Sequence, residues 1–200
     1  MATAVNRVEL ASIRLGNDLE RIAERLRRAT VQVRYAYAAG AGSGVIWTPD
    51  GVIVTNAHVV RSPTQQVLLS DGRELTARLI ARDERSDLAM LRVDADALPV
   101  LTVRDATSLQ AGEVVVAVGH PWGEINALSL GVVHTAMRGR KSMIVADLRL
   151  APGNSGGPMA DAEGQLVGIN CMIAKGFAVA IPTNVVTAFL RGAKAKAQAA

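Results

Sequence analysis

Residues 151–159, APGNSGGPM, place a serine among closely spaced glycines. Glycine is used where the backbone must adopt a positive φ or approach another group closely, so Ser155 does not suit the interior of a strand or helix. One interpretation is a plain tight turn. The other is a nucleophilic serine whose own N–H, together with that of Gly153, points at a carbonyl oxygen as it becomes negatively charged. The glycines alone leave both open.

A nucleophilic serine needs a base, and the sequence offers three histidines. His58 follows the strand-like run GVIVT, at an element boundary where a side chain can face a cleft. His120 and His134 lie in a turn-like and a strand-like stretch, and for both an ordinary histidine with one hydrogen bond is the simpler interpretation. No two histidines have the spacing of metal ligands and Cys171 is the single cysteine, so we expect no metal site and no intrachain disulfide.

Such a base is oriented by an acid. Asp87, in the stretch SDLAMLRV, stands directly before an apolar strand, where a carboxylate can be buried. His58, Asp87 and Ser155 are therefore candidates for one site, although spacing alone could be chance.

The chain between Thr30 and Pro182 consists of short β-type runs separated by Gly, Pro, Asp and Asn. Six runs precede the connection at residues 98–113 and six follow it. Turn sequences such as PDG and SDG predict antiparallel hairpins, and no alternation of strands with helices is visible. The sequence therefore predicts an all-β fold of barrels or a sandwich, with halves at about 30–98 and 112–182.

Helical periodicity occurs at both ends of the chain. In residues 1–29, where Gly16 weakens the helix, the apolar stripe is Val8, Leu15, Leu19, Ile22 and Leu26. This stripe either packs on the body of the protein or joins copies of the chain into a homo-oligomer. A second, short helix follows Pro182 and is predicted to end at Gly192, which leaves residues 192–200 as a flexible tail; its apolar positions are Val185, Val186, Phe189 and Leu190.

The composition of the 200 residues is globular, with 50% hydrophobic and 20% charged residues and a net charge of +4. Disordered and collagen-like chains are excluded. The basic clusters near residues 21–28 and 138–141 read as a solvated helix face and a turn, with nucleic-acid binding as the alternative. We expect no nucleic-acid partner. We also expect no membrane partner, because no apolar run reaches the ~18 residues needed to span a membrane. Lacking a signal peptide, the chain is expected in the cytoplasm, or outside it if a leader was removed.

The stretches GSGVIW, GVIVTNAHVV, SDLAMLRV and APGNSGGPM together resemble the trypsin-like serine peptidases, and most closely their HtrA/Deg branch. VVAVGHPWG with LGVVHT, and GINCMI with FAVAIPTN, support this branch, and the order His, Asp, Ser is the chymotrypsin-type order. The resemblance implies two six-stranded antiparallel barrels with the site in the cleft between them. It also implies a protease domain at residues 30–191 without a PDZ domain.

The resemblance further implies a serine endopeptidase that acts on peptides or unfolded proteins without a cofactor. Ser155 would attack the scissile carbonyl, His58 would take its proton and pass it to the leaving amine, and Asp87 would hold the imidazole in its working tautomer. The backbone N–H groups of Gly153 and Ser155, with Asn154 between them, would form the oxyanion hole. The alternative is a catalytically weak or inactive peptide-binding or chaperone module on the same fold.

The resemblance also implies a pocket for a small or medium apolar substrate side chain. Arg149 occupies the position at the base of this pocket, where a cation would favour an acidic substrate residue or block the pocket. The alternative interpretation is that Arg149 forms an ion pair with Asp147. The implied lining residues are Arg149, Leu150, Gly168, Ile169, Asn170 and Val179.

Overall fold

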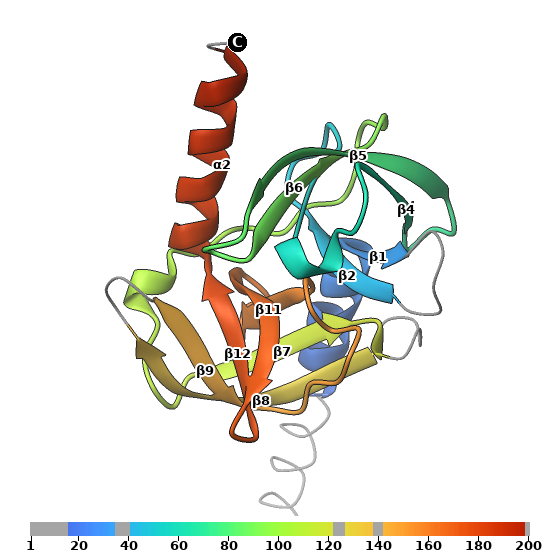
Figure 1. Ribbon diagram of the computed structural model, residues 1–200. Helices are drawn as coiled ribbons and strands as arrows, with labels where there is room; N and C mark the ends of the chain where they lie inside the picture. The colour runs from blue at the N-terminus through green and yellow to red at the C-terminus, as the bar shows by residue number, and fades with distance from the viewer. Residues whose placement is uncertain (1–15, 35–40, 122–126, 138–141, 199–200) are drawn as a thin grey trace, which may run out of the picture.

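The computed structural model describes residues 16–34, 41–121, 127–137 and 142–198, which form two β-barrels and two helices. Figure 1 shows the barrels packed against each other, with the C-terminal helix standing beside the first barrel. The basic cluster at residues 138–141 lies outside the described residues.

Both barrels are closed and have six strands, all paired antiparallel. The first runs in the order β1-β2-β3-β6-β5-β4 and consists of β1 (Thr30–Arg34), β2 (Ala41–Ile46), β3 (Val52–Thr55), β4 (Thr64–Leu68), β5 (Glu74–Asp83) and β6 (Leu88–Arg92). The second runs in the order β10-β11-β12-β9-β8-β7 and consists of β7 (Val114–Gly119), β8 (Ala127–Met137), β9 (Met143–Asp147), β10 (Pro158–Asp161), β11 (Leu166–Ala174) and β12 (Phe177–Pro182). The prediction of two six-stranded antiparallel barrels is confirmed.

The strands present aliphatic side chains, with valine and isoleucine prominent among them, to the barrel interiors. In β1, Val31 and Val33 are fully buried in the core of the first barrel. Two short 3₁₀ helices, η1 (Ala57–Val59) and η2 (Ala106–Ser108), interrupt the strand pattern, and η1 carries one of the candidate site residues.

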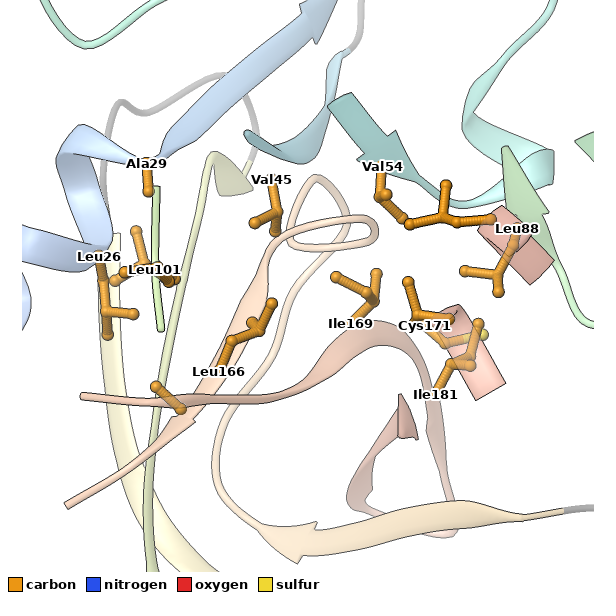
Figure 2. Close-up of a cluster of buried hydrophobic side chains, with 14 of the residues drawn as sticks. Leu26, Ala29, Val45, Val54, Leu88, Leu101, Leu166, Ile169, Cys171 and Ile181 are labelled. Atoms are coloured by element: carbon orange, nitrogen blue, oxygen red, sulfur yellow. The ribbon is translucent and has the colours of Figure 1, made fainter. Parts of the chain in front are cut away.

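A separate apolar cluster lies between the barrels and holds them together. Figure 2 shows side chains from both barrels and from the N-terminal helix converging on it. Val45 and Val54 enter from the first barrel, and Ile169 and Ile181 from the second. Because each barrel buries part of its apolar surface against the other, the two barrels have a fixed arrangement.

The N-terminal helix, described over residues 16–28, packs its apolar stripe on this cluster. Leu26 is fully buried and Ile22 nearly so, whereas Val8 and Leu15 lie outside the described residues. On the solvent side Arg28 pairs with Glu24 at 2.8 Å and Arg21 pairs with Asp18. The described part of the stripe therefore packs on the body of the protein, and the basic cluster is a solvated helix face.

The C-terminal helix α2 (Thr183–Gln198) is longer than predicted. Its buried residues, Val186 and Leu190, contact the cluster between the barrels. The expected end at Gly192 is wrong, because the alanines and lysines that follow are strong helix formers and outweigh the cost of one glycine. Among the described residues, neither helix is long and apolar enough to span a membrane.

Replacing Leu26 with alanine should lower the free energy of unfolding by about 2–5 kcal/mol, because it opens a cavity where the helix meets both barrels. Leu130→Ala is the matched control, since that side chain is 50% exposed and its truncation should cost about 0.5 kcal/mol. Denaturant titration measures both. Equal losses for the two variants would contradict this view of the helix.

Candidate active site

The side chains of His58 and Asp87 form a hydrogen-bonded pair. His58 Nδ1 lies 2.7 Å from Asp87 Oδ2, and the His58 backbone N–H donates to Asp87 Oδ1 at 3.0 Å. His58 belongs to η1, directly after β3, and Asp87 stands directly before β6, which pairs with β3. Neighbouring strands of the first barrel thus bring together two residues that are 29 positions apart.

Two opposing effects set the ionisation of Asp87. Partial burial raises its pKa, while hydrogen bonds from the ring and backbone of His58 and from the Cys171 thiol lower it. The hydrogen bonds prevail, so the pKa of Asp87 lies below its ordinary value. The carboxylate is therefore charged near neutral pH, and its Oδ2 is placed to accept a proton carried by His58 Nδ1.

The loop around Ser155 needs its glycines for both conformation and space. Gly153 has φ +107° and Gly156 has φ +88°, in the region that glycine tolerates best. A Cβ on Gly156 would lie 2.0 Å from the Ser43 carbonyl oxygen, and one on Gly153 would lie 2.2 Å from the carbonyl oxygen of His120. Of the two interpretations of the sequence, a plain turn does not account for this close approach to the first barrel.

Ser43 of β2 attaches this loop to the first barrel. Its N–H donates to the Ser155 carbonyl at 2.8 Å and its hydroxyl donates to the Gly153 carbonyl at 2.7 Å. From the other side, Asn170 receives the Gly156 N–H at its carbonyl oxygen, also at 2.8 Å. The loop is therefore held between β2 and β11.

The oxyanion-hole candidates occupy the tight turn in front of Ser155. The Asn154 N–H donates back to the Ala151 carbonyl at 3.0 Å. Within the described residues, the N–H groups of Gly153 and Ser155 donate to no backbone carbonyl. Both remain available as donors to a ligand.

Cys171 contacts both halves of the site, and sequence reasoning missed this role. Its carbonyl accepts the Ser155 hydroxyl at 2.9 Å, while its thiol lies 3.1 Å from Asp87 Oδ2. Burial, with the carboxylate nearby, raises the pKa of the thiol to about 12, so it stays protonated and donates. The register of β11 against β12 shifts between Asn170 and Met172, and this bulge aims Cys171 at the site.

The trypsin-like peptidase domain model matches residues 42–169, which include all three candidate residues. The chain belongs to the trypsin-like peptidase family. It is 44% identical over 160 residues to a probable periplasmic DegP-like serine endoprotease of Hahella chejuensis, covering 74% of this chain and 34% of that protein. It is 38% identical over 164 residues to serine protease HTRA1 of Xenopus tropicalis, covering 76% and 36%.

Solved structures of HtrA-type proteases share the fold of this peptidase domain. AlgW with a tripeptide superposes with a TM-score of 0.80 at 31% identity, covering 85% of this chain and 61% of that one. The serine endoprotease from Yersinia pestis gives 0.79 at 31% identity, covering 87% and 65%. The resemblance to the HtrA/Deg branch is confirmed. The chain spans about a third of the length of the curated relatives it matches.

Several residues of the expected substrate pocket are buried in the structure. The side chains of Ile169 and Asn170 are fully buried, the first in the cluster between the barrels and the second against the Pro158 carbonyl, so neither lines an open pocket. Gly168 is buried and Val179 nearly so, while Leu150 is half-buried against the core of the second barrel.

Arg149 is exposed and lines a surface hollow together with Asp147, Leu128 and Leu130. Among the described residues no ion pair joins Arg149 to Asp147, so the structure does not bear out that alternative.

The two other histidines of the peptidase lie apart from the pair formed by His58 and Asp87. His120 is buried, with Nδ1 3.2 Å from the Ser43 hydroxyl, as expected of a histidine with one side-chain hydrogen bond. His134 instead stacks on Phe177, with ring centroids 4.7 Å apart.

Burial lowers the pKa of His120 to about 4, against 6.5 for a free histidine. Between these values the unfolded chain binds a proton that the folded chain does not, so stability should fall as the pH drops from about 6.5 to about 4, by up to about 3 kcal/mol. Denaturant unfolding across this range measures the loss. His120→Gln should flatten the curve and His134→Gln should not; parallel curves for all three proteins would contradict the assignment.

Proposed function

We propose that this chain is a serine endopeptidase that hydrolyses peptide bonds in peptides or unfolded proteins, with the protease domain at residues 30–191. The observation that carries the proposal is the hydrogen bond between His58 Nδ1 and Asp87, in a site that Cys171 connects to a serine in a glycine loop. A free serine hydroxyl is a weak nucleophile near neutral pH, and an oriented imidazole overcomes this weakness.

In the proposed reaction Ser155 Oγ attacks the scissile carbonyl carbon while His58 Nε2 takes the hydroxyl proton. The C–N bond then breaks as the imidazolium gives that proton to the leaving amine, and water releases the acyl group by the same steps. Asp87 stays ionised throughout and stabilises the imidazolium. The lowered pKa of Asp87 supports this assignment, because a carboxylate that stays charged can stabilise an imidazolium beside it.

The N–H groups of Gly153 and Ser155 are the proposed oxyanion donors. Each such donor typically contributes about 3 kcal/mol to stabilisation of the transition state. The positive φ of Gly153 and the turn closed by Asn154 support the proposal, because they hold that backbone in place without using either N–H.

The exposed end of β11 supports an extended polypeptide as the substrate. Met172 and Ile173 are 49% and 51% exposed and follow directly after Cys171, which contacts Ser155. In the described strands, residues 172–174 pair with β12 on one side and have no partner on the side of β10. A peptide can add there as a further strand, and the AlgW relatives were solved with bound peptides.

The DegP-like relatives are named as periplasmic, which supports an extracytoplasmic location for this chain. The inactive peptide-binding module is the competing function, and no observation on the described residues favours it.

A fluorophosphonate probe should label the chain at Ser155, with Ser155→Ala as the unlabelled control. The same preparation should cleave an unfolded casein substrate, because the open edge of β11 accepts extended chains. Peptide mapping locates the label. Casein binding without labelling or cleavage would support the inactive module instead.

Changing Asp87 to asparagine should lower kcat on the order of 10⁴-fold, because the amide no longer selects the imidazole tautomer with a basic Nε2. KM should change little, since the substrate does not contact this side chain. Steady-state kinetics on a peptide substrate measure both constants. A variant that retained its kcat would rule out Asp87 as the orienting acid.

A further inference from the structure

Asn56 is a fully buried polar residue next to the candidate pair, and the proposed reaction has not used it. It stands at the N-cap of η1, where an asparagine normally accepts a backbone N–H of the helix through its side-chain oxygen. Here the side chain makes no capping hydrogen bond. The usual reason for an asparagine at this position therefore does not apply.

The amide of Asn56 instead holds the backbone of Asp87. Asn56 Nδ2 donates to the Asp87 carbonyl at 3.0 Å, and the Ala57 N–H donates to the same oxygen at 3.1 Å. Asp87 has φ +51°, in the left-handed region that non-glycine residues seldom adopt. In this conformation the carboxylate turns back onto His58, so the orientation of the carboxylate depends on what fixes the Asp87 main chain.

The amide is costly to bury. Asn56 Oδ1 has no hydrogen-bond partner among the described residues, and an unpaired buried acceptor reduces stability. An apolar side chain would fill the same space without this cost. What the amide adds is a side-chain donor to the Asp87 carbonyl, and no other side chain among the described residues donates to that oxygen.

We propose that Asn56 is a positioning residue: by holding the Asp87 carbonyl it keeps the Asp87 carboxylate aligned with His58 Nδ1. The inference rests on the proposed function for its effect on rate, but not for its effect on the geometry of the pair. Asn56, Ala57 and His58 together form one clamp, in which three consecutive residues each donate to Asp87.

Gln65 of β4 supplies a matched control. It too is buried, its amide donates to the carbonyl of Ser62 at 3.0 Å and to the Ser62 hydroxyl at 2.7 Å, and its Oε1 has no partner among the described residues. Within the part of the chain that the structure describes, no hydrogen bond joins it to His58 or Asp87. Asn56→Leu and Gln65→Leu therefore remove buried amides of the same kind inside and outside the clamp.

The test compares the two variants with the unchanged chain at a temperature where unfolding curves show all three to be folded. Asn56→Leu should lower kcat on the order of 10²-fold with KM unchanged, because a misplaced orienting group affects the transition state and not substrate binding. Gln65→Leu should keep both constants. If Asn56→Leu does not fold, Asn56→Ala takes its place in the comparison.

A second measurement separates this inference from the proposed function. In the Ser155→Ala background, proton NMR follows the His58 Nδ1 proton that is shared with Asp87, and activity is not needed. Asn56→Leu should weaken or shift this resonance, and Gln65→Leu should leave it in place. An unchanged resonance, or a kcat equal to that of Gln65→Leu, would overturn the positioning role, whereas absence of fluorophosphonate labelling in the unchanged chain would overturn only the proposed function.

Discussion

The site depends on the hydrogen bonds between Ser43 and the loop of residues 153–155, which connect the two barrels. His58 and Asp87 are held by the first barrel and Ser155 by the second, so neither barrel forms the site alone. Ser43 uses its backbone N–H on Ser155 and its hydroxyl on Gly153. These hydrogen bonds restrict movement of one barrel against the other at the loop that carries Ser155.

This contact explains why the positions around Ser155 are glycines. A side chain at Gly156 would collide with the Ser43 carbonyl, and one at Gly157 would come within 2.3 Å of the Val118 carbonyl. The loop can approach both barrels only because these residues have no Cβ. Burial of the apolar cluster between the barrels stabilises their association. Because the glycines let the loop lie close to both barrels, this association fixes the position of Ser155.

The sequence predicted the features that depend on local residue patterns. It did not predict the features that depend on strand register and on contacts between distant parts of the chain. Short β-type runs predicted twelve strands, and the motifs placed His58 after β3 and Asp87 before β6. Ile169 and Asn170 were expected at the substrate from the family resemblance, but the sequence does not reveal that Ile169 packs in the cluster between the barrels and Asn170 against the Pro158 carbonyl. The role of Cys171 depends on a bulge, and a register shift of one residue leaves no mark in a single sequence.

Cys171 also shows how the two halves of the site are linked in the ligand-free chain. Its thiol shares Asp87 Oδ2 with His58, so it limits the movement of the carboxylate, and its carbonyl accepts the Ser155 hydroxyl. In the proposed reaction this hydroxyl must leave the carbonyl and turn toward His58 Nε2 before it can lose its proton. The strand that carries Cys171 continues into the exposed edge proposed to bind substrate. A peptide added along that edge would therefore lie beside the serine at the moment when the hydroxyl turns.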